Sequence, residues 1–329
     1  MNFQGLGKIE TYEQYLDMAF KDSMKVAESI RSDTKSQDRI VKSRRVESAR
    51  VMTVAKSLIS NLDGIIKRFP SIDHLPPFYN ELVHCTIDYE LLKKSLGALN
   101  WAKKQLQNLL DQTIIELRRN KRLHHFNVVR TSFSGRASSV MKQIKKNLEF
   151  LEGARKIMKS YPALKTSVPT IVIAGMPNVG KSTLLAAITG AKPHVASYPF
   201  TTQKLNLGYD AEENQYIDTP GLLDRPIAKR NPIERQAILA LKHVANLVVF
   251  IIDPTESCGY PIGDQEKLLA DIKKQFAVPV IIVSNKTDLS KPYPESIAAS
   301  AKTGKGIDAV RAAITSALAR QHTSAQNPA

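Results

Sequence analysis

A glycine-rich stretch with the sequence GMPNVGKST begins at Gly175 and has the composition of a phosphate-binding loop. Gly175 and Gly180 allow the backbone to wrap so that successive N–H groups point at phosphate oxygens. Lys181 reaches the outer phosphates, and Ser182 offers a hydroxyl to Mg²⁺. The apolar run Thr170–Ala174 and a helical pattern flank the loop, which is the strand–loop–helix context that this motif requires. The stretch therefore predicts a nucleotide site.

A second segment, DTPG, closes another short apolar run. The carboxylate of Asp218 can hold Mg²⁺ through water, and the N–H of Gly221 can contact the γ-phosphate. The segment therefore adds a metal ligand and a phosphate sensor to the predicted site.

Two later segments, NKTD and SAK, have the residue types that read a guanine base. Asp288 can accept hydrogen bonds from guanine N1–H and N2–H, a pair of donors that adenine lacks. Lys286 can lay its stem over the ring, and Asn285 can brace the phosphate loop. In Ser300–Lys302, the N–H of Ala301 can cap guanine O6. Four segments in this order, each at the carboxyl end of a predicted strand, indicate a site for GTP and GDP.

Composition restricts the class of protein and its partners. The 329 residues suffice for two domains, and 47 Lys and Arg against 31 Asp and Glu leave a charge of +16. Such a charge favours a polyanionic partner, nucleic acid first and an anionic membrane second. Cys85 and Cys258 are far apart, which indicates thiols in a reducing cytosol. Without a membrane-length apolar segment or a signal sequence, we expect a cytoplasmic monomer with no stable membrane association.

The first half of the chain is predicted to be helical. Thr11–Gln14 fits a capping box at the start of the first helix. A second helix is predicted from about Gln37 to Phe69, ending before Pro70. A third carries leucines near heptad positions from Leu92 to Leu117, and a fourth includes the apolar positions from Val140 to Leu151. These helices are expected to form a bundle.

After Pro169, strand and helix patterns alternate, which is typical of a mostly parallel sheet with helices on both faces. We therefore predict an α + α/β chain in which an N-terminal helical bundle precedes a P-loop GTPase domain. The expected domains are 1–166 and 167–320, with a disordered tail at 321–329. Only a short, proline-containing segment separates Asp288 from Ile297, so an extended connection or a single turn is expected there instead of a crossover helix.

Basic residues of the helical half fall into three groups. These are Lys42, Arg44, Arg45 and Arg50; Arg118, Arg119, Lys121, Arg122, His124 and His125; and Lys142, Lys145 and Lys146. A solvated helix face is the alternative for each group, but three groups of one sign favour binding to a phosphate backbone. The histidine pair has no acidic or cysteine neighbour and is interpreted as part of this surface. Trp101 is expected in the core.

Most of the chain, from about residue 5 to 320, resembles the nucleolar GTP-binding protein 1 (Nog1) family of Obg-like GTPases, in an archaeal short form. The similarity includes the nucleotide motifs and several segments outside them. Those further segments are Phe69–Asp73, Pro77–Leu82, Leu96–Asn100, Tyr198–Thr202, Asp218–Asp224, Asn231–Gln236 and Ser257–Tyr260. The resemblance implies a role in assembling the large ribosomal subunit, with the helical domain contacting rRNA and ribosomal proteins.

The resemblance also assigns switch I and completes the predicted site. Thr202, chosen over Thr201 by similarity to the Obg pattern, would give its hydroxyl to Mg²⁺ when a γ-phosphate is present. The predicted metal ligands are Ser182, Thr202 and Asp218, and the predicted catalytic residues are Lys181, Thr202 and Gly221. The predicted nucleotide contacts are Pro177, Asn178, Val179, Gly180, Lys181, Ser182, Thr183, Phe200, Thr201, Thr202, Asp218, Gly221, Asn285, Lys286, Asp288, Ser300, Ala301 and Lys302.

Two positions bear on the rate of hydrolysis. Leu222 stands where a glutamine would orient the attacking water, and a leucine cannot hydrogen-bond it, so slow intrinsic hydrolysis is expected. Asn178 matches a loop asparagine that helps hold K⁺ in related GTPases, so K⁺ is a candidate cofactor; a neutral loop residue is the alternative.

Two other functions share the same site chemistry. The chain could be a GTPase that acts on other RNA, such as a tRNA-modification or translation factor. It could also be a signalling GTPase at a membrane surface, although its basic helices lack the aromatic and aliphatic stripe of interfacial helices.

Overall fold

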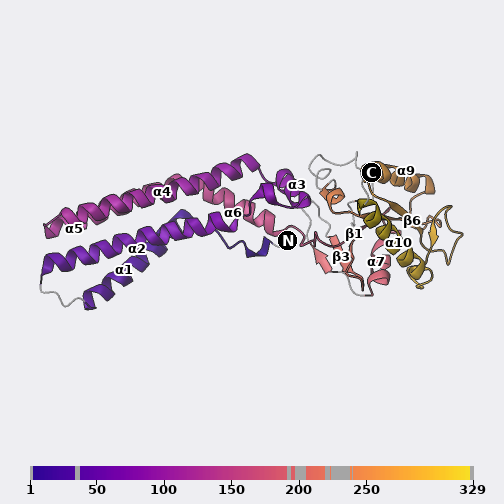
Figure 1. Ribbon diagram of the computed structural model, residues 1–329, viewed down its shortest axis with the longest axis horizontal. Helices are drawn as coiled ribbons and strands as arrows, with labels where there is room; N and C mark the ends of the chain where they lie inside the picture. Colours follow the sequence, from indigo (N-terminus) through magenta and orange to yellow (C-terminus); the bar gives the residue numbers. More distant parts are fainter. Residues whose placement is uncertain are drawn as a thin grey trace. The chain divides into compact units, whose positions relative to one another are not determined.

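The computed structural model describes residues 3–33, 38–190, 194–196, 205–218, 223, 238 and 240–326 (Figure 1). Contacts divide the chain into two compact units. The helical unit comprises residues 4–71 and 87–159, and the sheet unit comprises residues 1–3, 72–86 and 160–329. The sequence placed everything up to residue 166 in one helical domain, whereas this division groups residues 72–86 and 160–166 with the sheet unit.

Among the described residues, five long helices form the helical unit. They are α1 (Tyr12–Asp33), α2 (Arg39–Arg68), α4 (Tyr89–Arg119), α5 (Leu123–Gln143) and α6 (Lys145–Lys159), preceded by the short η1 (Phe3–Gly5). Helix α2 lies centrally and contacts α1, α4 and α5. Leu99, Leu106 and Leu117 of α4 are fully buried, as the heptad spacing predicts. The predicted bundle is therefore confirmed.

The predicted start signal of α1 is also confirmed. The N–H of Thr11 donates to Gln14 Oε1 at 3.0 Å, and the N–H of Gln14 donates to Thr11 Oγ1 at 3.3 Å. This reciprocal pair satisfies two backbone donors that the first helical turn leaves without partners. At α2, the side chain of Asp38 accepts from the N–H groups of Ile40 and Val41.

Two details of the bundle differ from the prediction. The structure has two helices, α5 and α6, where the sequence predicted a single fourth helix. The helix is interrupted at Ile144, where φ is −93° and ψ is 9°. Ile144 is buried and keeps the apolar spacing of a continuous helix, so the sequence pattern did not indicate the interruption. The assignment of Trp101 to the core is wrong, since this side chain is 40% exposed. It follows Leu99 by two positions, about 200° around the helix, and therefore lies on the opposite face from that buried leucine.

Arg50 does not belong to the exposed basic surface that the sequence predicted. Its Nη1 lies 3.6 Å from Oε2 of Glu47, a buried carboxylate that also lies 2.7 Å from Arg130 Nε. Burial lowers the pKa of Arg50, and the nearby Arg130 lowers it further. Arg50 therefore takes part in an internal charge cluster of the bundle.

The sheet unit contains a seven-stranded sheet in the order β2-β3-β4-β1-β5-β6-β7. The strands are β1 (Thr170–Ala174), β2 (His194–Ala196), β3 (Leu205–Tyr209), β4 (Gln215–Asp218), β5 (Leu247–Ile252), β6 (Val280–Ser284) and β7 (Ile297–Ala298). Strands β4, β1, β5, β6 and β7 are mutually parallel. Strand β3 pairs antiparallel with both β2 and β4. The mostly parallel sheet is therefore confirmed.

Helices cover the sheet. They are α7 (Lys181–Thr189), α9 (Ile262–Gln275) and α10 (Ile307–Gln326), with the short η4 (Leu241–His243) before β5. Helices α7 and α10 contact each other, whereas α9 contacts β5 and lies on the other side of the sheet (Figure 1). Strands β1 and β5 are buried along their whole length, which places the core of this unit at the middle of the sheet.

The two predictions near the carboxyl end have different outcomes. Residues 285–296 contain turns and no helix, so the short connection from β6 to β7 is confirmed. Ser284 holds it, because its Oγ lies 2.7 Å from Ser296 Oγ and accepts from the N–H of Tyr293 at 2.8 Å. The tail was predicted from residue 321, but α10 continues to Gln326; residues 327–329 lie outside the described part.

Residues 72–86 join the sheet unit through η2 (Ile72–His74) and α3 (Pro77–Thr86). The hydroxyl of Tyr79 donates to the carbonyl of Pro162 and accepts from the N–H of Leu164, both at 2.9 Å. Its ring packs edge-on against Phe3. Burial raises the pKa of Tyr79 to about 12. These contacts tie α3 to the segment that leads into β1.

Candidate nucleotide-binding site

The glycine-rich loop connects β1 to α7 and depends on two glycines. Gly175 has φ = 143°, and a Cβ there would lie 2.6 Å from the carbonyl oxygen of Ile251. Gly180 has φ = 100°, and a Cβ there would overlap the side-chain amide of Asn285. Any other residue would strain the backbone and collide with these neighbours. The loop is therefore held closely against β5 and the segment that follows β6.

Lys181 is the first residue of α7 and is buried. Its ammonium group lies beside the glycine-rich loop. Its Nζ donates to the carbonyls of Gly175 and Met176 at 2.9 and 2.8 Å. The N–H of Leu184 donates to the carbonyl of Gly180 and completes the first helical turn. An ammonium group and a helix N-terminus thus meet at one point, where they would attract phosphate oxygens.

The predicted metal ligands Ser182 and Asp218 are in contact. Ser182 Oγ donates to Asp218 Oδ2 at 2.5 Å. Asp218 ends β4 and is fully buried, and its Oδ1 has no hydrogen-bond partner among the residues that the structure describes. A buried carboxylate oxygen is costly without a cation or a donor. The hydroxyl and carboxylate oxygens therefore fit Mg²⁺, which prefers oxygen ligands.

Asn206 on β3 adjoins the two predicted metal ligands, and no motif in the sequence indicates this position. Its Nδ2 donates to Asp218 Oδ2 at 2.9 Å and to Ser182 Oγ at 3.4 Å. Asn206 and Asp218 are register partners in the β3–β4 pair. The antiparallel register brings the amide to the carboxylate, so only knowledge of the strand pairing could have identified Asn206.

Asn285 braces the phosphate loop, as predicted. Its Nδ2 donates to the carbonyl of Val179 at 2.8 Å, and its Oδ1 accepts from the N–H of Ala301 at 2.9 Å. One side chain therefore joins the phosphate loop, the end of β6 and the loop after β7. The N–H of Ala301, predicted to cap guanine O6, is already engaged by Asn285 and would have to be shared with the base or released to it.

The remaining residues predicted to read the base lie on two adjacent loops. Lys286 has φ = 59°, and Thr287 donates to the carbonyl of Ala299 from both its N–H, at 3.2 Å, and its Oγ1, at 3.0 Å. These bonds fix the turn on which Asp288 is exposed to solvent. Ser300 is buried, and its Oγ accepts from the N–H of Thr303 at 3.3 Å. Its side chain therefore supports the loop from within.

The described site residues fall on three loops at the carboxyl ends of β1, β6 and β7, with Asp218 at the end of β4. Asn178 has φ = 61° and is exposed, whereas Val179 is buried. Pro177 is half-buried, and Thr183 and Lys302 are exposed. Four predicted contacts lie outside the described residues: Phe200, Thr201, Thr202 and Gly221. Leu222 also lies outside them.

Comparison with known proteins gives two matching families. The NOG1 N-terminal helical domain matches residues 3–164, and nucleolar GTP-binding protein 1 (NOG1) matches residues 232–288. Among the described helices, none combines the length and the hydropathy of a membrane-spanning segment.

Similar proteins occur in archaea and eukaryotes. An uncharacterized protein of Methanocaldococcus jannaschii is 41% identical over 87% of this chain and 81% of its own length. Nucleolar GTP-binding protein 1 of Arabidopsis thaliana is 37% identical over 70% of this chain and 35% of its own length. A crystal structure of nucleolar GTP-binding protein 1 from Plasmodium falciparum matches with 31% identity and a TM-score of 0.44, covering 50% of this chain and 93% of that one.

The eukaryotic relatives are longer proteins, since the chain spans 35% to 48% of their length. The family is nevertheless shown across both units: the helical-domain match includes the whole bundle, and the second match ends at Asp288, in the segment predicted to read the base. The chain belongs to the nucleolar GTP-binding protein 1 (NOG1) family.

Proposed function

We propose that this protein is a GTP-hydrolysing switch that acts in assembly of the large ribosomal subunit. It would work as a cytoplasmic monomer whose helical unit contacts rRNA and ribosomal proteins. The observation that carries the proposal is the meeting of the phosphate loop, a buried carboxylate and the base-reading loops at one edge of the sheet. The family membership and the charge of +16 support the ribosomal part.

The described residues have separate tasks in this mechanism. Lys181 would exchange its two loop carbonyls for phosphate oxygens and stabilise the charge that develops during transfer. Ser182 and Asp218 would hold Mg²⁺, with Thr202 as the switch I ligand. The bound ion would neutralise charge on the phosphate oxygens. Asn206 would keep the Asp218 carboxylate oriented toward Ser182.

The switch itself would consist of the segments that carry Thr202 and Gly221. Ordering of such segments by a γ-phosphate, and their release after hydrolysis, is the usual bistable element of a GTPase. Leu222 cannot orient a water molecule, so a partner, an rRNA surface or a cation would complete the site. Slow hydrolysis alone and faster hydrolysis on the particle are therefore expected.

K⁺ is the candidate cation, and Asn178 is its candidate loop ligand. Asn178 lies in the phosphate loop with φ = 61° and an exposed side chain, so its amide is accessible to a cation. We expect faster GTP turnover in K⁺ than in Na⁺ at equal ionic strength, and a loss of this difference in Asn178→Ala. Equal rates in the two salts would remove K⁺ from the mechanism.

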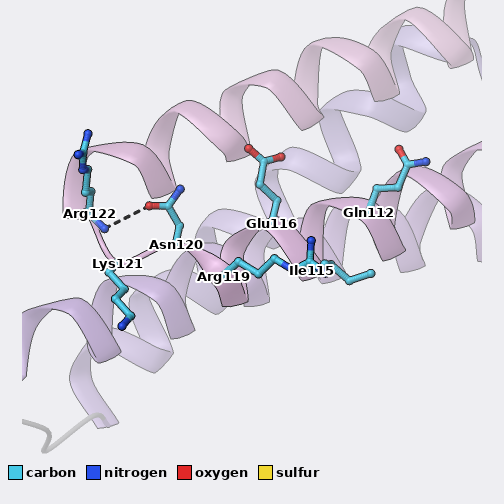
Figure 2. Close-up of a pocket in the computed structure, with 7 residues that line it drawn as sticks. All are labelled: Gln112, Ile115, Glu116, Arg119, Asn120, Lys121 and Arg122. Atoms are coloured by element: carbon cyan, nitrogen blue, oxygen red, sulfur yellow. Dashed lines mark hydrogen bonds between the residues drawn. The ribbon is translucent and has the colours of Figure 1, made fainter.

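One end of the helical unit offers a concentrated basic surface. The start of α2 and the α4–α5 turn lie at this end (Figure 1). A pocket of about 520 Å³ lies at the turn, and Figure 2 shows the residues that line it. Its lining residues are Gln112, Ile115, Glu116, Arg119, Asn120, Lys121 and Arg122. The three basic side chains among them are exposed, so they can reach phosphates without loss of a buried partner.

Replacing Arg119, Lys121 and Arg122 by glutamine should weaken rRNA binding. It should also make the binding constant less dependent on salt concentration. Each phosphate contact contributes about 0.7 to 0.9 to the slope of log K against log salt. The triple variant should therefore lower the slope by about 2 to 3, measured by binding of an rRNA fragment at several salt concentrations.

A matched variant removes the same charge elsewhere on the bundle. Lys56, Lys94 and Lys104 are exposed on α2 and α4, and their replacement by glutamine should leave the slope nearly unchanged. Equal slopes for both triple variants would show that the basic turn is not the rRNA-contacting surface.

Sedimentation with large-subunit particles tests the proposed function. The protein should co-sediment to different extents with a non-hydrolysable GTP analogue and with GDP. Binding to any RNA without preference for the particle would favour a GTPase that acts on other RNA. Binding to anionic vesicles without particle binding would favour a membrane-surface GTPase.

A further inference from the structure

The loop between β5 and α9 contains a buried carboxylate that the mechanism above does not use. Asp253 follows β5 and is fully buried. Its Oδ1 accepts from the N–H of Thr255 at 3.0 Å and from the hydroxyl of Thr255 at 2.5 Å. Its Oδ2 accepts from the N–H of Cys258 at 2.9 Å and from Ser257 Oγ at 3.1 Å. The loop that contains the family-like segment Ser257–Tyr260 is thus folded around this carboxylate.

The same carboxylate holds the lysine of the base-reading loop. Lys286 Nζ donates to Asp253 Oδ2 at 2.6 Å and to Ser257 Oγ at 2.8 Å. Burial alone would raise the pKa of Asp253, but hydrogen bonds from Lys286 and Thr255 outweigh burial and keep this pKa below its usual value. The carboxylate is therefore charged at neutral pH, and Lys286 supplies its counter-charge.

Gln265 makes this anchor rigid. Its Oε1 accepts from the N–H of Asp253 at 2.9 Å, and its Nε2 donates to the carbonyls of Asp253 and Tyr260 at 3.1 and 3.0 Å. Gln265 lies on α9 and is fully buried. The Asp253–Lys286 pair is therefore fixed to the body of the sheet unit, unlike an exposed ion pair, whose contribution is usually small.

We propose that Asp253, assisted by Ser257, is a positioning residue for guanine recognition. By holding the ammonium group of Lys286, it orders the aliphatic stem as one wall of the base pocket. It also fixes the turn that presents Asp288, two residues along the chain. A free lysine side chain would lose conformational entropy when it packs on a base, and the anchor removes most of this cost before binding.

A competing interpretation is that Asp253 only organises its own loop. A double-mutant cycle separates the two, because it measures whether Asp253 acts through Lys286. In Asp253→Asn, an NH2 group replaces one of the two carboxylate oxygens. This group faces hydrogen-bond donors and cannot accept from them. In Lys286→Met, the stem remains and the ammonium is removed. The third variant combines both changes, and GDP affinity is measured for all four proteins.

Asp253→Asn should weaken GDP binding by about 10- to 100-fold, or about 1.4 to 2.8 kcal/mol. In the Lys286→Met background, the same change should have less than about one third of that free-energy effect. Selectivity for GDP over IDP should also fall in Asp253→Asn, because inosine lacks the N2 amine that Asp288 would read. A loss of loop structure alone would weaken both nucleotides equally.

Two further proteins keep the test decisive. Asp264→Asn removes an exposed carboxylate of α9 that pairs with Lys267, and it should bind GDP as the parent protein does. If Asp253→Asn fails to fold, Ser257→Ala replaces it in the cycle, since Ser257 is the second anchor of Lys286. Additive effects with Lys286→Met, or unchanged GDP affinity in a folded Asp253→Asn protein, would overturn the proposal.

Discussion

Lys181→Ala is expected to abolish tight GTP binding and to reduce hydrolysis by at least about 100-fold, because removing one preorganised donor at a transition-state oxyanion costs about 10²- to 10³-fold. The ammonium group is buried at the phosphate loop, where its two bonds to loop carbonyls keep it in place. Single-turnover hydrolysis and GTP titration measure the two effects separately.

Lys273→Ala provides the matched control, because Lys273 is exposed on α9 of the same unit. This variant should hydrolyse GTP at the parent rate. The unfolding midpoint of both variants without nucleotide shows whether the loop itself has been damaged. Full GTPase activity in Lys181→Ala would show that the glycine-rich loop is not the phosphate site.

Asp288→Asn is expected to change base preference from guanine to xanthine. The exposed carboxylate would accept two hydrogen bonds from guanine, and a bond to a charged group contributes about 1.5 to 3 kcal/mol. An asparagine amide loses one of these acceptors but can donate to the O2 of xanthine. GTP affinity should therefore fall by at least about 100-fold, while XTP binding should become tighter than in the parent protein.

Competition of GTP, XTP and ATP against a fluorescent nucleotide measures this change. Asp308→Asn is the control, since Asp308 is an exposed carboxylate at the start of α10 that pairs with Arg311. A variant Asp288→Asn that retains the parent preference for GTP over XTP would show that the base is read elsewhere.

The local parts of the fold were accessible from the sequence. The capping box at Thr11–Gln14 and the phosphate loop depend on residues that are close in the chain, so their spacing alone identifies them. The bracing role of Asn285 was also predicted, because the order of the motifs fixes which loops meet at the edge of a parallel sheet.

The parts that the sequence did not reveal depend on contacts between distant segments. Asn206 reaches the predicted metal ligand Asp218 through the β3–β4 register, and Asp253 reaches Lys286 across the end of the sheet. Neither side chain belongs to a spacing pattern. Tyr79 joins α3 to the sheet unit through a hydroxyl that a helical pattern does not distinguish from a core aromatic ring.

Two errors came from treating apolar character as a sufficient signal. Ile144 has the spacing of a continuous helix, yet the chain turns there from α5 into α6 while the side chain stays buried. Trp101 is large and apolar, yet it falls outside the buried stripe that Leu99 and Leu106 define on α4. Apolar character therefore indicated neither the end of α5 at Ile144 nor the exposure of Trp101.

Isothermal titration calorimetry of the full chain with GDP, GTP and ATP, each with Mg²⁺, tests the central claim most directly. We expect saturable heat with one site per chain for GDP and for GTP, and none for ATP at the same concentrations. An absence of heat with both guanine nucleotides, or equal binding of ATP, would contradict the assignment of this sheet edge as a guanine-nucleotide site.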